Sequence, residues 1–183
     1  MSTEPSFRTT DRELVLDLGF LSVTRRSVEA PDGTPFSRIV IEHPGAVAVV
    51  PITEGEVVLI RQYRAALGDH ILEIPAGKLD LVGENAEVAA RRELAEETGF
   101  VARSLTHLID LWTSVGFCDE RIAIFVTEDL EAGSRTPLGP EESDAQVVRM
   151  PLEHAVSLVA SGEIADAKTA VGLLLAARVR ASS

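Results

Sequence analysis

The sequence is poor in cysteine and in positive charge, and both shortages limit what the protein can do. It contains one cysteine, Cys118, so neither an intramolecular disulfide nor a cysteine-based zinc cluster can form within the chain. We interpret Cys118 as a small apolar residue rather than a nucleophile, because no sequence signal supplies it with a base. The 17 basic residues are outnumbered by 29 acidic ones. The resulting net charge of -12 opposes non-specific binding to nucleic acid or to an anionic membrane surface.

Long apolar segments are also missing. The N-terminal segment through Val15 lacks the basic region and the continuous apolar stretch of a signal peptide, and runs such as Leu173–Ala177 are far too short to span a bilayer. Hydrophobic residues make up 45% of the 183-residue chain, which suffices for one sizeable core with a small accessory module. We therefore expect a soluble, cytoplasmic protein with one main domain.

Apolar groups and turn residues along the chain predict both strands and helices. Short β-branched groups, broken at Pro31–Gly33 and His43–Gly45, predict two or three strands between Leu14 and Val50. The segment Asn85–Thr98 contains neither Gly nor Pro and precedes Gly99, which predicts a helix with a glycine C-cap. Further strands are expected at 57–60, 105–112, 122–126 and 146–150, helices at 152–160 and 164–180, and a functional or mobile irregular connection at 128–144.

The predicted helix 85–98 carries three glutamates on one face. Because residues advance by 100° along a helix, Glu97 lies 40° to one side of Glu93 and Glu96 lies 60° to the other side, so all three fall on one face. Such like-charge pairs each cost roughly 0.2–0.5 kcal/mol on an isolated helix unless cations neutralise them, and hard divalent cations prefer carboxylate oxygens. The alternative is a solvated acidic face, with Arg92 and Glu96 as an ordinary i,i+4 pair, and the three glutamates alone do not decide between the two.

The pattern around these glutamates is more specific. Gly77 is followed after six residues by Glu84, and after seven more by the run Arg92–Phe100, which reads RELAEETGF. This pattern closely resembles the Nudix box, although the family usually has five residues between the first glycine and the first glutamate. An insertion before the helix leaves the carboxylate spacing untouched, so we expect it to affect only the loop conformation near residues 80–83.

Three further segments, Arg61–Arg64, Leu72–Gly77 and His43–Val47, resemble the ADP-ribose pyrophosphatase branch of the Nudix family. The resemblance implies an α/β fold, the Nudix α/β/α sandwich with a mixed β-sheet, over residues 44–183. It also implies an N-terminal β subdomain over residues 1–43 that is exchanged across a homodimer. The residues themselves predict strands there, not a dimer.

The same resemblance implies the metal site. Glu93 and Glu97 would bind the metal, with the backbone carbonyl of Ala76 and Glu96 completing the site, and Arg92 would hold the glutamates in position. The expected cofactor is Mg²⁺ or Mn²⁺, with two or more ions per site, since the two metals accept similar oxygen ligands.

The base that activates water in this branch comes from a glutamate in a mobile loop after the box. The acidic stretch Pro140–Asp144 matches that loop, so Glu142 is the first candidate and Glu141 the second. Glu120 is a further candidate. For each of these residues the alternative interpretation is a solvated loop carboxylate without a catalytic role.

The expected substrate site contains Arg64, whose guanidinium can hold a diphosphate with forked hydrogen bonds, and Glu73, which can accept hydrogen bonds from the nucleotide. A surface salt bridge is the alternative for Arg64. The expected reaction is hydrolysis of ADP-ribose to AMP and ribose 5-phosphate. Val115 replaces the proline usual in this branch, which leaves open another nucleoside diphosphate sugar or a dinucleotide. A sensor that binds without cleaving is disfavoured, because all three box glutamates are present.

Overall fold

The computed structural model describes residues 6–81 and 83–182, and it divides the chain into two compact units. The first unit is the chain through Gly45 together with Trp112–Arg121, and the second contains Ala46–Leu111 and the chain from Ile122 onward. The loop 112–121 is therefore grouped with the N-terminal segment. In the part of the chain described, no helix has the length and apolar character needed to cross a membrane.

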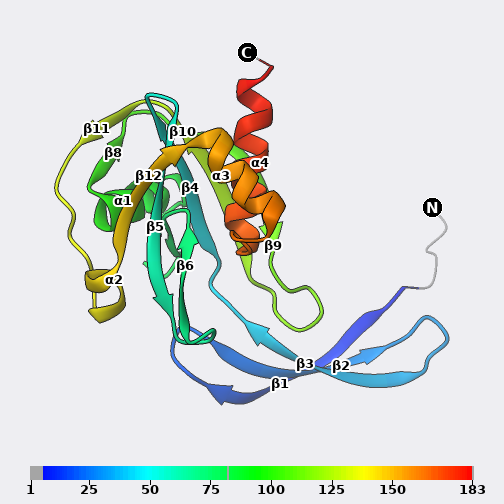
Figure 1. Ribbon diagram of the computed structural model, residues 1–183. Helices are drawn as coiled ribbons and strands as arrows, with labels where there is room; N and C mark the ends of the chain where they lie inside the picture. Colours follow the sequence, from blue (N-terminus) through cyan, green and yellow to red (C-terminus); the bar gives the residue numbers. More distant parts are fainter. Residues whose placement is uncertain (1–5, 82, 183) are drawn as a thin grey trace. The chain divides into compact units, whose positions relative to one another are not determined.

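The first unit is built on a three-stranded antiparallel sheet in the order β1-β2-β3 (Figure 1). Its strands are β1 (Arg8–Asp17), β2 (Ser22–Glu29) and β3 (Pro35–Glu42). The predicted turn at Pro31–Gly33 joins β2 to β3, and Gly33 adopts a positive φ of 84°. Strand β1 begins at Arg8, well before Leu14, where we expected the first strand. The sequence did not indicate this start, because the first residues of β1 are polar and carry no apolar alternation.

The second unit contains a mixed seven-stranded sheet. Its main path runs β12-β5-β4-β10-β9, with β6 paired to β5 and β7 paired to β4. Strand β10 runs parallel to β4, whereas β5, β7 and β12 pair with their neighbours in antiparallel fashion. The strands are β4 (Ala46–Thr53), β5 (Glu56–Arg64), β6 (Asp69–Glu73), β7 (Ala76–Lys78), β9 (Thr106–Trp112), β10 (Arg121–Thr127) and β12 (Gln146–Pro151).

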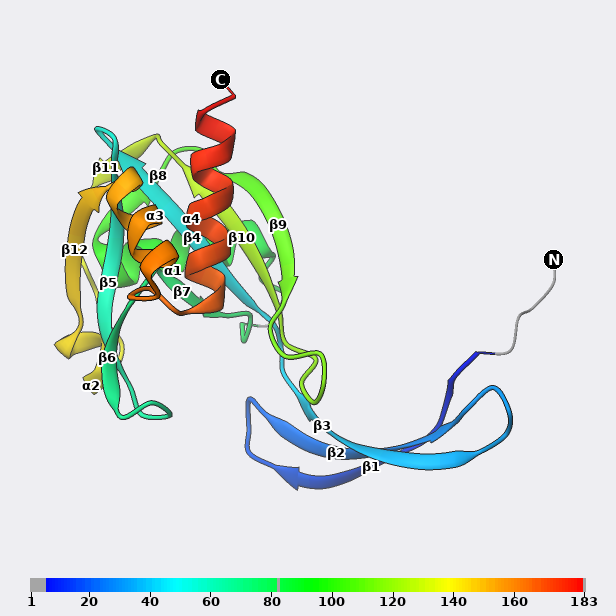
Figure 2. The same cartoon turned by 45° about the vertical axis from the view of Figure 1, so that its right-hand side comes forward.

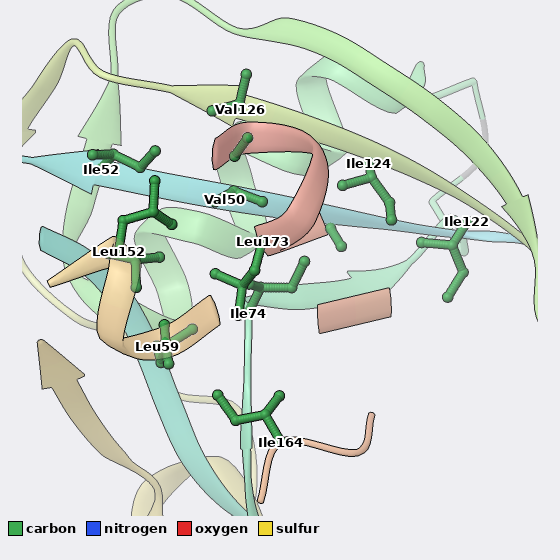
Figure 3. Close-up of a cluster of buried hydrophobic side chains, with 14 of the residues drawn as sticks. Val50, Ile52, Leu59, Ile74, Ile122, Ile124, Val126, Leu152, Ile164 and Leu173 are labelled. Atoms are coloured by element: carbon green, nitrogen blue, oxygen red, sulfur yellow. The ribbon is translucent and has the colours of Figure 1, made fainter. Parts of the chain in front are cut away.

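Helices cover both faces of this sheet (Figure 2). Helix α1 (Ala86–Thr98) packs on one face, and α3 (Leu152–Ser161) and α4 (Ala167–Arg180) pack on the other. The alternation of β4 explains this arrangement, because successive side chains of a strand point to opposite faces. Val47 and Val49 contact the α1 cluster, while the intervening residues join the α3–α4 cluster. Figure 3 shows that second cluster, which includes Val50, Ile52, Leu59, Ile74, Leu152 and Leu173.

The ends of α1 follow from local sequence. Asn85 is the N-cap, and its side chain accepts a hydrogen bond from the N–H of Val88 at 2.9 Å. Gly99 ends the helix in the left-handed region, at φ 76°, and donates to the carbonyl of Ala95. The helix predicted over Asn85–Thr98 is confirmed, with Asn85 as its cap.

The connection 128–144 is more regular than its composition indicates. It contains β11 (Leu130–Ala132), which pairs with β8 (Phe100–Ala102), and the five-residue helix α2 (Pro140–Asp144). Pro140 fits the first turn of α2 because its missing N–H would have no helical partner there. The last helix begins later than predicted, because Asp166 caps it by accepting from the N–H of Thr169 at 3.0 Å.

Candidate active site

Strand β7 and helix α1 approach each other closely at Gly77. A Cβ atom at this position would lie 1.9 Å from Cδ of Glu93, a separation that real atoms do not tolerate. Glycine at the first position of the motif therefore lets the Glu93 carboxylate lie against the strand backbone. Val82, within the loop that carries the extra residue, lies outside the described residues.

Glu97 is the most buried carboxylate of the helix face, with 4% of its surface exposed. Its Oε2 accepts a hydrogen bond from the backbone N–H of Ala76 at 2.9 Å. Burial raises the pKa of Glu97 to about 8, and the negative charges of Glu93 and Glu142 add to that shift. The Ala76 hydrogen bond and the positive charge of Arg64 act in the opposite direction. A buried acid of this kind binds a cation favourably, because the cation offsets both the desolvation and the repulsion.

Arg92 contacts three glutamates at once. Its Nε and Nη2 bind the two carboxylate oxygens of Glu84 at 3.0 and 2.9 Å, and its Nη1 donates to Glu93 at 2.7 Å and to Glu96 at 3.1 Å. The hydrogen bond with Glu84 raises the pKa of Arg92, whereas burial raises the pKa of Glu93. The contacts of Arg92 with Glu93 and Glu96 are those expected of a residue that holds the glutamates in place.

Glu84 is a site residue whose role the sequence did not indicate. Only 8% of its side chain is exposed, and its bidentate contact fixes the guanidinium of Arg92. The one indication in the sequence was its position as the first glutamate of the motif. Among residues 6–81 and 83–182, no group of three His, Cys, Asp or Glu side chains is arranged to hold a metal ion, and both Glu93 and Glu96 accept hydrogen bonds from Arg92.

The acidic segment of α2 lies near this helix face. Glu142 raises the pKa of both Glu93 and Glu97 through its negative charge, which places its carboxylate within electrostatic reach of them. Its Oε2 accepts a hydrogen bond from the N–H of Leu138 at 2.5 Å. Glu141 is exposed and is not among the largest influences on the pKa of either glutamate. The charge effects of Glu142 on Glu93 and Glu97 thus favour Glu142 over Glu141 as the candidate base.

Glu120 belongs to the first unit. There its Oε2 accepts from Oγ1 of Thr113 at 2.7 Å, and its Oε1 lies 3.6 Å from Nε2 of His43. These two contacts give Glu120 a structural role within its loop.

Arg64 and Glu73 bind each other. Nε and Nη2 of Arg64 donate to the two oxygens of Glu73 at 2.5 and 2.8 Å, and Lys168 also donates to Glu73. Glu73 is 1% exposed, whereas 38% of the Arg64 side chain is exposed. Glu73 therefore holds one edge of the guanidinium, and Arg64 remains partly exposed.

Lys168 extends this contact into a buried network that the sequence did not predict. Its Nζ also lies 3.0 Å from Asp166, and Asp166 binds the hydroxyl of Thr169. The same hydroxyl accepts from the N–H of Ile74, two residues before β7, at 3.0 Å. The network thus connects the start of α4 to Arg64 and to the strand end that faces Glu97. Lys168 is the only lysine of a largely aliphatic helix, and no pattern in the sequence indicates that it binds Glu73.

Comparison with known proteins agrees with this arrangement. A family model described as the NUDIX domain matches residues 42–170. ADP-ribose pyrophosphatase of Bacillus subtilis (strain 168) is 39% identical over 167 residues, which cover 91% of this chain and 90% of that protein. The methanol dehydrogenase activator of Bacillus methanolicus is 39% identical over 147 residues, 80% of this chain and 79% of that protein. A crystal structure of an ADP compounds hydrolase superposes with a TM-score of 0.85 at 27% identity, covering 100% of this chain and 98% of that one.

Proposed function

This chain belongs to the Nudix family as a pyrophosphohydrolase, and from that premise we propose that it cleaves the diphosphate bond of ADP-ribose to give AMP and ribose 5-phosphate. The observation that carries the proposal is the cluster formed by Glu93 and Glu97 against β7, with Glu142 and Arg64 within electrostatic reach of Glu97. The relative from Bacillus subtilis is named for this activity, and the structural neighbour for hydrolysis of ADP compounds. That neighbour also confirms the expected α/β/α sandwich with a mixed sheet.

The proposed cofactor is Mg²⁺ or Mn²⁺, with two or more ions bound by Glu93, Glu97, the carbonyl of Ala76 and Glu96. The residues fit such a cation, because Glu97 is a buried carboxylate whose pKa is raised by burial and by neighbouring negative charge. When bound, the ions would neutralise charge on the diphosphate oxygens and lower the pKa of the attacking water.

The chain's own residues would position the glutamates and the substrate and deprotonate the attacking water. Arg92, fixed by Glu84, holds Glu93 and Glu96, and the Ala76 N–H orients Glu97. Glu142 would accept the proton of the water as its oxygen attacks phosphorus, while the bond from phosphorus to the bridging oxygen breaks. Arg64 would orient the substrate with the edge of its guanidinium that Glu73 does not occupy.

We also propose that the enzyme is a cytoplasmic homodimer in which the N-terminal β subdomain is exchanged. Within the first unit, β1–β3 form a sheet in which Thr24 is the only fully buried residue of the three strands. Such a sheet needs a packing partner, since three strands are stable alone only with a covered hydrophobic face. The apolar residues in or beside its strands that are about half exposed or more are Phe7, Leu14, Val15, Leu16, Leu18, Phe20 and Ile39. Light scattering should give the mass of a dimer, and Leu14→Lys with Ile39→Lys should shift it toward a monomer.

The substrate is tested by incubating the protein with ADP-ribose, NADH, ADP-glucose or GDP-mannose, each with Mg²⁺ or Mn²⁺, and measuring the phosphate-ester products. We expect the highest kcat/KM with ADP-ribose, with AMP and ribose 5-phosphate formed in equal amounts. Val115, which is 79% exposed, leaves the alternative of another nucleoside diphosphate sugar or a dinucleotide. A higher kcat/KM with one of the other three compounds would favour that alternative, and no cleavage of any of them would contradict the proposal.

A further inference from the structure

The segment 133–136 lies along the C-terminal end of α1. The N–H of Gly133 donates to the carbonyl of Gly99 at 2.6 Å, and the N–H of Thr136 donates to the carbonyl of Glu96 at 3.1 Å. These bonds satisfy carbonyls at a helix end that have no partner within the helix. The approach is close, because a Cβ at Gly99 would lie 3.1 Å from the backbone N of Arg135.

Arg135 continues this connection from α1 to α2. Its Nε donates to the backbone carbonyl of Glu97 at 2.6 Å, its Nη1 to the carbonyl of Ala145 at 2.8 Å, and its Nη2 to the carbonyl of Glu142. One guanidinium therefore joins the last turn of the glutamate-bearing helix to both the middle and the C-cap of α2. Its planar array of five N–H donors suits three acceptors in different directions, which a lysine ammonium does not match.

Helix α2 depends on contacts with other elements for its place. It spans five residues, none of which is buried, and its N-cap Gly139 supplies no side-chain hydrogen bond. A helix of this length is not stable by itself in water. Its other side-chain hydrogen bonds are two local ones, from the N–H of Leu138 to the Glu142 carboxylate and from the Ser143 hydroxyl to the carbonyl of Gly139, and one to β6, in which Nε2 of His70 lies 2.9 Å from Oδ2 of Asp144. The His70 contact holds the end of α2 to β6, whereas Arg135 binds the backbone of α2 to α1.

We infer that Arg135 is a positioning residue for hydrolysis, which sets the place of Glu142 relative to Glu93 and Glu97 by tying the backbone of α2 to the end of α1. This inference rests on the proposed function, in which Glu142 accepts the proton of the attacking water. The sequence gives no indication of it, because Arg135 lies in an irregular segment outside the Nudix box.

The first test is kinetic. In Arg135→Met the apolar stem remains and the three donors are lost, so kcat should fall about 10–100-fold, since a misplacement of about 1 Å in a catalytic group costs roughly that much. KM should stay within about twofold, and Arg135→Lys should restore kcat only in part, because one ammonium cannot serve three carbonyls. Arg103→Met is the matched control, because Arg103 pairs with Glu131 on the exposed surface. A parental kcat in Arg135→Met would overturn the inference.

A double-variant cycle tests whether the effect passes through Glu142. Two residues that act through one group have non-additive effects on kcat. In the Glu142→Gln background, Arg135→Met should therefore lower kcat by less than about twofold further. Equal losses in both backgrounds would overturn the inference, as would a parental kcat in Glu142→Gln, since Arg135 could then not act through that carboxylate.

Hydrogen exchange supplies a readout that needs no activity. The amide of Ser143 donates to the carbonyl of Gly139, and the amide of Ala145 donates to the carbonyl of Glu141. Both should exchange faster in Arg135→Met, while the amides in the middle of α1 exchange as in the parent. Unchanged exchange in α2 would overturn the inference. Failure of the parent protein to cleave ADP-ribose would instead contradict the proposed function, and the exchange result would still decide whether Arg135 holds α2.

Discussion

The backbone N–H of Ala76 and the carboxylate of Glu97 are joined by a hydrogen bond of 2.9 Å. Strand β7 thus orients a carboxylate that burial and like charge keep in a partly protonated state near neutral pH, with a pKa of about 8. A cation that binds there displaces that proton and removes the repulsion from Glu93. Replacing Glu97 by glutamine should therefore remove metal-dependent activity while the fold is kept.

Glu97→Gln should lower kcat by roughly 10²–10³-fold, the range seen when an electrostatic group that acts on developing charge is removed. The fold should persist, because glutamine can still accept from Ala76 and carries no charge to desolvate. Glu87→Gln is the control, since Glu87 pairs with Arg91 on the exposed first turn of the same helix. Both variants should be assayed at saturating Mg²⁺, where near-parental turnover of Glu97→Gln would contradict the metal assignment.

The pKa of Glu97 also predicts how stability depends on pH in the absence of metal. Because its pKa is raised in the folded state, from 4.5 to about 8, folded protein binds the proton more tightly than unfolded protein. The contribution of Glu97 to stability is therefore full below pH 4.5 and is lost as pH rises from 4.5 to 8. In thermal melts with EDTA, Glu97→Gln should match the parent near pH 5 and exceed its melting temperature near pH 8. If the two proteins differ in melting temperature by the same amount at both pH values, this prediction is contradicted.

Gly77→Ala tests the close contact between β7 and α1. Its added Cβ would lie 1.9 Å from Cδ of Glu93, so that carboxylate must leave its place against the strand. A displacement of about 1 Å predicts a loss of kcat/KM on the order of 10²-fold. Replacing Glu93 by the shorter aspartate in the same variant should relieve the overlap and return part of the activity. Kinetics and circular dichroism should be measured together, and parental kcat/KM in Gly77→Ala would refute the role given to this glycine.

The sequence predicts those parts of the structure that local geometry determines. The period of the helix places Glu93, Glu96 and Glu97 on one face, and Asn85 and Gly99 mark its ends, because caps act within a few residues. Strand β1 was missed in part, since its polar residues lack the apolar alternation of a half-buried strand.

The supporting residues of the site depend on contacts between distant segments. Lys168 meets Glu73 across 95 residues, and Arg135 meets Glu97 across 38, so neither partner can be inferred without the fold. Helix α2 was expected as an irregular segment because its stability comes from such contacts rather than from its composition. The motif therefore points to the candidate ligands and to Arg92, which holds two of them, whereas Lys168 and Arg135 could not be predicted from the sequence.

Substitution of each loop glutamate tests whether Glu142, rather than Glu141, is the general base. Glu142→Gln should lower kcat by about 10²–10⁴-fold, the usual contribution of a positioned proton acceptor, with little change in KM. Glu141→Gln should have a much smaller effect, because Glu141 is exposed and, unlike Glu142, is not among the largest influences on the pKa of Glu93 or Glu97. A large loss in Glu141→Gln or Glu120→Gln, with parental kcat in Glu142→Gln, would move the base to that residue.

Lys168→Met should destabilise the protein, because it removes one of two cations from a carboxylate that is 1% exposed. Removing one partner of a buried ion pair typically costs about 3–5 kcal/mol, since the other charge is left uncompensated. Lys168→Met with Glu73→Gln should recover part of that loss, because the neutral amide needs no second cation. KM for the substrate should nevertheless rise in the double variant, since Arg64 loses the charged partner that fixes its guanidinium. Urea denaturation of the parent, the two single variants and the double variant measures the coupling between the two residues. Strictly additive changes in the free energy of unfolding would show that Lys168 and Glu73 do not act as a pair.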